Sequence, residues 1–287
     1  MNIKIVHKRD KGYPLPLNNI ASPPQQLYIY GADLVELLKR PRLAIVGSRN
    51  VSAYGRQITA KLARELAEQG IVIISGLALG VDAIAHAAAL DAGGLTIAVL
   101  PSPVDHPYPS SNAQLAKRIV DNGGILVSEY SEDIFSFKTN FVARNRLVAG
   151  LAQAVLITEA AEKSGSLHTA RFALEQGKDV LAVPGNITSI GSVGTNNLIK
   201  AGATPVTNYL DVLHVMKLKP HNTKPKEVRG RNANEQTVID LIIQGNNDGD
   251  ELLKKSGLDI SQFNQVMTML EISAKIRPLG NNKWSLG

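Results

Sequence analysis

The stretch LAIVGSRNVSAYGRQITAKLARELAEQG at residues 43–70 decides the fold. It begins with a short apolar run, LAIV, passes through a turn that contains Gly47, and continues into a segment whose apolar residues recur about every 3.6 positions. That spacing predicts a helix, which Gly70 ends. A second apolar run, IVII at residues 71–74, follows at once. Short runs that are apolar throughout are typical of strands in a parallel sheet covered on both faces.

The same alternation of apolar runs and helix-like segments continues along the chain. Further runs lie at residues 96–100, 125–127, 154–157, 180–183 and 204–206. Strands that alternate with helices require right-handed crossovers, so residues 42–216 are predicted to form a doubly wound, mostly parallel α/β domain. Residues 1–41 are rich in proline, asparagine and tyrosine, and we expect an extended N-terminal lead-in that packs on this domain.

The chain changes character after residue 216. Residues 217–232 are polar and basic and contain Pro220 and Pro225, which predicts a linker. Residues 233–287 are predicted to form a small domain of three helices, at 235–244, 248–256 and 261–271, closed by a hairpin. This order of elements indicates a winged-helix-like domain.

Composition sets limits on function. The 287 residues contain no cysteine, which excludes disulfides, cysteine-based zinc sites and thiol catalysis. No apolar run approaches the roughly 18 residues of a membrane-spanning helix, and the first ten residues lack the apolar centre of a signal peptide. We therefore expect a cytoplasmic protein without a membrane span. Most of the net charge of +6 comes from the basic linker, so a binding site on the main domain must be inferred from local residues.

Polar and glycine-rich motifs follow directly after several predicted strands. They are Gly47-Ser48-Arg49, SGLALGVD at residues 75–82, Glu159 with Ser164-Gly165-Ser166, and Pro184-Gly185-Asn186. Because ligands of open α/β sheets bind at the carboxyl ends of the strands, these motifs predict one binding crevice. Glycine and free backbone N–H groups favour an anion such as phosphate. The alternative for the first motif is a tight turn with a surface arginine.

The segment FKTNFVARNR at residues 137–146 combines cations, aromatic rings and amides. Its cations are Lys138, Arg144 and Arg146. Rings that stack on bases beside cations that hold phosphates are typical of proteins that bind single-stranded nucleic acid. The alternative is that Phe141 is a core residue and that the arginines form ion pairs with Glu129 or Glu159.

Catalytic groups are not indicated by the sequence. Asp82 and His86 are four residues apart, and we expect Asp82 to cap loop N–H groups and His86 to be a partly buried histidine with satisfied hydrogen bonds. The chain shows no GxSxG elbow, no cluster of metal ligands and neither of the usual nucleotide fingerprints. These observations indicate a binding protein, and we expect no catalytic residue, metal or cofactor.

The ordered motifs resemble those of the DNA-processing protein A family (DprA, also called Smf). They include IVGSR at residues 45–49, SGLALGVDAIAHAAAL at 75–90, FVARNR at 141–146, EAAEKSGSLHTA at 159–170 and GTNNLIKAGA at 194–203. The resemblance implies a Rossmann-like domain that binds single-stranded DNA and loads the RecA recombinase onto it during natural transformation and recombination. No catalytic activity is implied.

The resemblance also implies roles for individual positions. The DNA-binding residues it implies are Gly47, Ser48 and Arg49 in a phosphate-gripping loop, Lys138 and Phe141 as basic and aromatic contacts, Arg144, Asn145 and Arg146 in the RNR motif, and Ser164, Gly165 and Ser166 in an SGS loop. Val142 stands where the family usually has proline. The resemblance further implies a homodimer formed through the end of the Rossmann-like domain, where Leu198 and Ile199 lie.

Two other functions are open at this point. A related Rossmann family hydrolyses nucleoside monophosphates with a PGGxGT-like motif, which Pro184-Gly185-Asn186 and Gly194-Thr195 match only in part because the second glycine is lacking. A nucleotide-sensing scaffold is the third interpretation. Release of ribose phosphate from AMP would indicate the hydrolase, whereas salt-sensitive binding of oligo-dT would indicate the DNA-binding protein.

Overall fold

The computed structural model describes all residues except 1, 132–137, 222–227, 274, 281 and 287. The chain divides into two compact units, Met1–His221 and Asn222–Gly287, which are described separately below. The boundary between them lies within the stretch 217–232 that the sequence predicts to be a linker.

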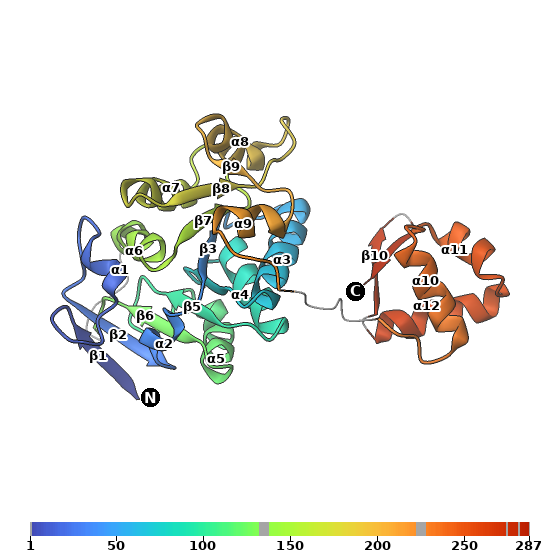
Figure 1. The fold of residues 1–287 in the computed structure, drawn as a ribbon, viewed down its shortest axis with the longest axis horizontal. Coiled ribbons are helices and arrows are strands. Elements are labelled where there is room, and N and C mark those ends of the chain that lie inside the picture. Colours follow the sequence, from blue (N-terminus) through green and yellow to red (C-terminus); the bar gives the residue numbers. More distant parts are fainter. Residues whose placement is uncertain (1, 132–137, 222–227, 274, 281, 287) are drawn as a thin grey trace. The chain divides into compact units, whose positions relative to one another are not determined.

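In the described part of the first unit, nine strands form one sheet in the order β1-β2-β6-β5-β4-β3-β7-β8-β9 (Figure 1). The seven strands from β6 to β9 pair in parallel, whereas β2 pairs antiparallel with β1 and with β6. The bounds are β1 Ile3–His7, β2 Gln26–Gly31, β3 Arg42–Val46, β4 Val72–Ser75, β5 Thr96–Val99, β6 Ile125–Ser128, β7 Ala154–Ile157, β8 Asp179–Ala182 and β9 Thr204–Pro205. The predicted doubly wound, mostly parallel sheet is confirmed.

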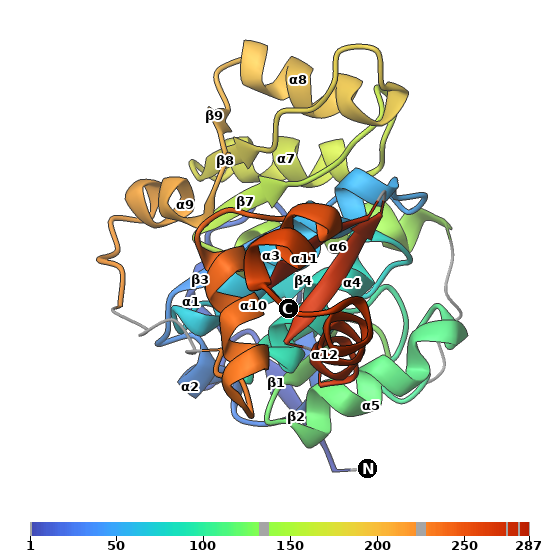
Figure 2. The ribbon, with the colours of Figure 1, turned by 90° about the vertical axis from the view of Figure 1, so that its right-hand side faces the viewer.

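Helices cover both faces of the sheet (Figures 1 and 2). Residues from α1, α2, α6 and α7 share one apolar cluster with the sheet, and residues from α3, α4 and α9 share the cluster on the other face. A third cluster joins α5 to the sheet. The bounds are α1 Leu15–Asn18, α2 Leu34–Leu37, α3 Ala53–Glu68, α4 Val81–Asp91, α5 Ala113–Asp121, α6 Lys138–Leu151, α7 Ser166–Glu175, α8 Val193–Lys200 and α9 Tyr209–Val215.

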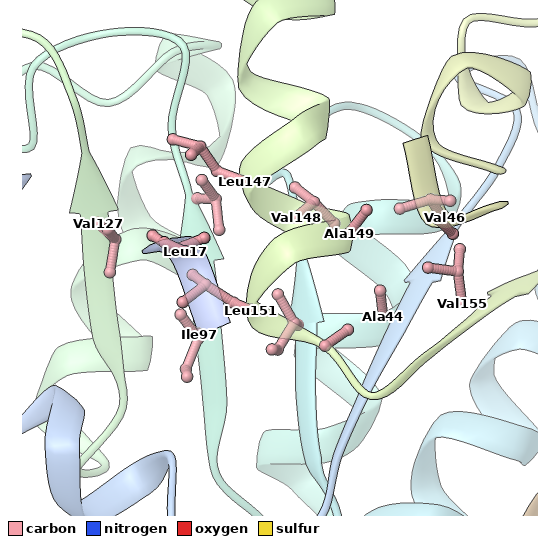
Figure 3. Packing of buried hydrophobic residues seen from close by; sticks show 14 of the residues in the cluster. Leu17, Ala44, Val46, Ile97, Val127, Leu147, Val148, Ala149, Leu151 and Val155 are labelled. Atoms are coloured by element: carbon pink, nitrogen blue, oxygen red, sulfur yellow. The ribbon is translucent and has the colours of Figure 1, made fainter. Parts of the chain in front are cut away.

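Helix α6 is fixed by its second half, which is buried against the sheet (Figure 3). Leu147, Val148 and Leu151 are at most 1% exposed, and they pack in the same cluster as Ala44 and Val46 of β3. The intervening β3 residues Leu43 and Ile45 belong to the cluster on the opposite face. This alternation explains why residues 43–46 of β3 are all apolar, because a strand between two helical layers buries both of its faces.

The N-terminal residues differ from the expected extended lead-in. Strands β1 and β2 form an antiparallel pair that continues the sheet beyond β6. In β2, Leu27 and Ile29 are buried while the residues between them are partly exposed. This period of two is typical of a strand that buries one face, and it places residues 1–41 within the sheet domain.

The second unit contains α10 (Ala233–Ile243), α11 (Gly249–Ser256), α12 (Ile260–Ile272) and an antiparallel pair, β10 (Ile276–Gly280) and β11 (Lys283–Leu286). Its core is formed by residues such as Ile239, Leu252, Phe263 and Leu270. Three helices and a hairpin are the elements that the sequence predicts here, and the assignment to the winged-helix class stays a prediction. Among the helices of the described residues in either unit, none is long and apolar enough to cross a membrane.

Candidate nucleic-acid interface

The polar motifs meet where the winding of the sheet reverses. From β3 the chain adds β4, β5 and β6 on one side, and α6 then returns it to β7 on the other side of β3. The loops after β3 and β7 touch, because the Ser48 N–H donates to the Glu159 carbonyl at 2.8 Å. The Val81 N–H, at the start of α4, donates to the Ser48 carbonyl at 3.1 Å. Such a reversal is where open α/β sheets bind ligands.

A pocket of about 670 Å³ opens at this reversal. Its walls come from the loop after β3, the start of α4, the loop before α5, the first half of α6 and the start of α7. The lining residues are Val46, Gly47, Ser48, Arg49, Ala78, Asp82, Tyr108, Phe141, Val142, Arg144, Asn145, Ala161, Lys163, Ser164, Gly165, Ser166 and Thr169. Nine of the eleven predicted DNA-binding residues are among them. Arg146 is not, and the side chain of Lys138 lies outside the described residues.

An aromatic and cationic group lies at the mouth of the pocket. The guanidinium carbon of Arg49 lies 5.0 Å from the centre of the Phe141 ring. Tyr108 meets the same ring edge-on, with 5.3 Å between the ring centres. Arg49 is exposed, so its charge is accessible to a ligand. The ring keeps the guanidinium in place through a cation–π contact without neutralising its charge.

The loop Gly47-Ser48-Arg49 offers fewer free donors than the sequence suggests. The Ser48 amide is already bonded to Glu159, and the Ser48 hydroxyl donates to the Asn50 carbonyl at 2.9 Å. Gly47 is required by packing, because a Cβ there would lie 2.7 Å from the Glu159 carbonyl oxygen. The guanidinium of Arg49 is therefore the main donor that this loop presents.

The start of α7 forms the opposite wall. The hydroxyls of Ser164 and Ser166 are 2.8 Å apart, and the Asn145 side chain donates to the Gly165 carbonyl at 3.3 Å. Lys163 precedes them, is exposed and has no ion pair among the described residues. The positive end of a helix dipole, hydroxyl groups and a free ammonium group together favour an anion at this wall.

Arg144 lies at the floor of the pocket and is only 3% exposed. One terminal nitrogen of its guanidinium donates to the carbonyl of Gly76, which follows β4, and to that of Val99, which ends β5. Its Nε has no hydrogen-bond partner among the described residues. Burial lowers the pKa of Arg144 to about 10, against the effect of the Asp82 carboxylate. The guanidinium is still charged at neutral pH and holds two loops together.

Two more ionisable groups lie near Arg144. Asp82 accepts the Gly76 N–H at 3.0 Å and the Ala78 N–H at 3.4 Å, which confirms the prediction that it caps loop N–H groups. Burial raises the pKa of Asp82, and the charge of Arg144 acts in the opposite direction. Burial lowers the pKa of His86 to about 3, and the charge of Arg144 adds to this effect, so the histidine is neutral at physiological pH. His86 was expected to be partly buried with satisfied hydrogen bonds, but it is fully buried and its Nε2 has no partner among the described residues.

Arg146, one of the predicted contacts, does not line the pocket. Arg146 is paired with Glu129 through two bonds, of 2.8 and 2.6 Å, and also donates to the Ser22 carbonyl at 2.8 Å. Both side chains of this ion pair are 14% exposed, so Arg146 is not offered to a ligand in the pocket. The ion pair with Glu129 is the alternative that the sequence left open. Lys138 begins α6, but its side chain lies outside the described residues.

Among the cationic and aromatic side chains of the pocket wall, Lys163 and Tyr108 were not assigned to the site from the sequence. Lys163 immediately precedes the SGS loop, and a cation beside the hydroxyl-rich start of a helix was a usable signal. Tyr108 follows an irregular loop, and nothing in the local pattern indicates that its ring reaches Phe141. Within the described residues, no group of three or more histidine or acidic side chains is arranged to hold a metal ion.

These features define a doubly wound α/β protein with a cationic, aromatic pocket at the reversal of its sheet. The chain matches the DNA recombination-mediator protein A family over residues 4–217 and belongs to that family. It is 41% identical over 202 residues to DNA processing protein DprA of Bacillus subtilis, and the matched stretch covers 70% of this chain and 67% of the relative. It is 42% identical to protein Smf of Escherichia coli, over 73% of this chain but only 55% of the relative.

Two solved structures are similar to this one. DprA from Streptococcus pneumoniae has a TM-score of 0.70 and 40% identity, and the match covers 76% of this chain and 75% of the other. DNA processing protein A from Helicobacter pylori, whose structure gives insight into a unique single-stranded DNA binding mode, has a TM-score of 0.68 and 36% identity. That match covers 76% of this chain and 97% of the other.

Proposed function

We propose that this chain binds single-stranded DNA in the pocket at the reversal of the sheet. The observation that carries the proposal is the stacking of Arg49 on Phe141 beside Tyr108. This arrangement places a free cation and an aromatic surface at one opening, which is what a strand with unpaired bases requires. A base stacks on the Phe141 ring while Arg49 and Lys163 contact the phosphates.

Family membership supports a role in DNA processing during natural transformation. In that role the bound strand is protected and passed to the RecA recombinase, and two copies of the chain act together as a homodimer. A dimer places two pockets on one particle, so a long strand that engages both binds more tightly than either pocket alone explains. Light scattering at micromolar concentration tests the dimer, and a purely monomeric mass contradicts it.

The proposal is one of binding without catalysis. The partial phosphoribohydrolase motif, Pro184-Gly185-Asn186, lines a different groove from the Arg49 pocket. Its Gly185 N–H donates to the Asn196 side chain at 3.1 Å, so this amide is already engaged. Incubation with AMP should release no ribose phosphate, and release of ribose phosphate would favour the hydrolase instead.

Fluorescence anisotropy with labelled oligo-dT and a duplex of equal length tests the binding site. We expect Arg49→Ala to weaken binding of the single strand and to reduce the magnitude of the salt slope by about 0.7, the contribution of one phosphate contact. Arg171→Ala is the matched control, because Arg171 is an exposed arginine on α7 that pairs with Glu175 at 2.7 Å and does not line the pocket. If both variants bind the single strand as the parent does at every salt concentration, the assignment of the DNA-binding site to this pocket is wrong.

A further inference from the structure

A second groove, of about 660 Å³, lies beside the start of α3. One wall is Ser52, Ala53 and Tyr54, and the other comes from the loop between β8 and α8, including Asn186 and Ser189. The described residues that line it carry no charged side chain. A phosphate group is therefore not the ligand of the groove itself, and a neutral, flat group suits it better.

Two apolar residues, Ile187 and Ile190, directly follow the lining residues Asn186 and Ser189 in the chain. Ile187 and Ile190 are 89% and 80% exposed, and Tyr54 is 50% exposed. The Tyr54 hydroxyl donates to the Pro184 carbonyl at 2.9 Å, which holds the ring across the groove. Single exposed apolar residues are common, but a fixed ring and two aliphatic side chains beside one groove indicate a surface that contacts a ligand.

The groove and the Arg49 pocket are held together by Glu159. The Glu159 carbonyl accepts the Ser48 N–H at 2.8 Å in the pocket wall. Its carboxylate accepts the Ser52 N–H at 3.0 Å and the Ser52 hydroxyl in the groove wall. Arg49 and Ser52 are three residues apart and so lie within about 11 Å of each other. A strand that leaves the pocket therefore reaches the groove directly.

Arg56 supplies a cation for the path between the two sites. It is exposed on the first turn of α3 and follows Ala53 by three residues, so both lie on the same side of the helix. That turn contains no acidic residue, although the helix dipole favours acids there and disfavours a cation. The Glu159 carboxylate accepts from Ser52 at the helix start and already complements the dipole, so Arg56 is the group that a phosphate would contact.

We propose that the groove at the start of α3 is a second base-binding subsite for the strand that occupies the Arg49 pocket. The next phosphate contacts Arg56, and a base enters the groove between Tyr54 and Ile187. This inference rests on the proposed function, and it assigns a surface that the pocket does not include. Continuity with the pocket, the nearby cation and the neutral aromatic groove favour a nucleobase over a peptide.

A length series of oligo-dT from about 4 to 16 nucleotides tests the subsite by anisotropy. Oligonucleotides too short to span both sites should bind Tyr54→Ala as they bind the parent. Longer ones should bind it roughly 5- to 150-fold more weakly, the range for one lost stacking contact. Tyr54→Phe is the matched control, because it keeps the ring and removes only the hydrogen bond to Pro184, and it should bind long oligonucleotides much like the parent.

Ile187→Ala is a second test of the subsite, in case Tyr54→Ala disturbs the fold. Ile187 is 89% exposed and contributes little to folding. If Ile187→Ala weakens the binding of long oligonucleotides only, the cause is therefore a lost contact with the DNA and not a folding defect. The subsite is overturned if Arg49→Ala weakens every length while Tyr54→Ala and Ile187→Ala bind all lengths normally. If Arg49→Ala has no effect, the proposed function itself fails. If these variants keep normal DNA binding but lose dimer mass in light scattering, the groove belongs to a contact between two copies.

Discussion

Arg49 and Arg144 line the same pocket, but the protein uses the two guanidinium groups in different ways. Arg49 is exposed at the mouth, where its described contact is the ring of Phe141. Arg144 is buried at the floor and donates to two backbone carbonyls at the carboxyl ends of the neighbouring strands β4 and β5. The charge of Arg49 at the mouth is available to a ligand, whereas the guanidinium of Arg144 at the floor holds the loops that shape the pocket.

This difference separates residues that contact a ligand from residues that position those contacts. Arg144 is surrounded by groups that depend on it, including the buried carboxylate of Asp82. A Cβ at Gly76 would clash with the guanidinium, so the loop after β4 is shaped around it. We therefore expect floor variants to change stability first and mouth variants to change binding alone.

The largest effect is expected for Arg144→Met, which keeps much of the side-chain volume. The change leaves two buried carbonyls unpaired and the Asp82 carboxylate without its nearby cation. Loss of one partner of a buried charge pair costs about 3–5 kcal/mol in the free energy of unfolding. Urea denaturation measures this loss. If unfolding is unchanged while DNA binding disappears, Arg144 is a direct contact and the division is wrong.

The second effect is a pH dependence that comes from His86. Its pKa is about 3 in the folded protein and 6.5 ordinarily, so between these values the unfolded state binds a proton that the folded state does not. Stability is therefore expected to fall as the pH is lowered below 6.5, by up to about 1.4 kcal/mol per pH unit from this group. The measurement is urea denaturation at several acidic pH values.

His86→Gln is the control for this pH dependence, because it removes the titrating ring and leaves Asp82 in place. The difference between the two pH slopes then reports His86 alone. Parallel slopes for the parent and the variant would show that the histidine is accessible to protons in the folded state, which contradicts its burial at the floor.

The third effect is on binding at the mouth. Phe141→Ala removes the ring that stacks on a base, so we expect single-strand binding to weaken by roughly 1–3 kcal/mol with an unchanged salt slope. Phe141 belongs to none of the four buried apolar clusters, so its removal should hardly change the free energy of unfolding. Phe141→Trp should keep the affinity. A large loss of stability in Phe141→Ala would support the alternative that this ring is a core residue.

The sequence predicted the parallel part of the sheet well because most strands there contain a short apolar run and each is followed by its own helix. It failed for β1 and β2, which satisfy their hydrogen bonds by pairing with each other and, for β2, with β6, far along the chain. The alternation of buried residues in β2 was visible. Its partner was not, because local patterns carry no information about pairing across so many residues.

The candidate site was predicted in outline for a related reason. Residues that follow the carboxyl ends of parallel strands must gather at one edge, so Arg49, Ser164 and Ser166 are brought together by topology alone. The sequence could not tell which of Arg144 and Arg146 lines the pocket. Two positions apart on a helix, the two side chains point in different directions, and the motif does not show which direction faces the pocket. The burial of Leu147 and Leu151 sets the rotation of α6, and that rotation depends on the whole core.

The smallest effect is expected for Lys163→Ala at the edge of the pocket. Lys163 is exposed and unpaired among the described residues, so its removal should leave the free energy of unfolding unchanged. A single solvated phosphate contact should lower the magnitude of the salt slope by about 0.7. It should cost less than about 1 kcal/mol in affinity near physiological salt, because exposed ion pairs are weak. Lys117→Ala is the control, since Lys117 is an exposed lysine on α5 that pairs with Asp121 and does not line the pocket. If Lys163→Ala keeps the parent slope while Arg49→Ala lowers it, the phosphates pass only along the wall formed by the loop after β3, and the start of α7 shapes the pocket without contacting the strand.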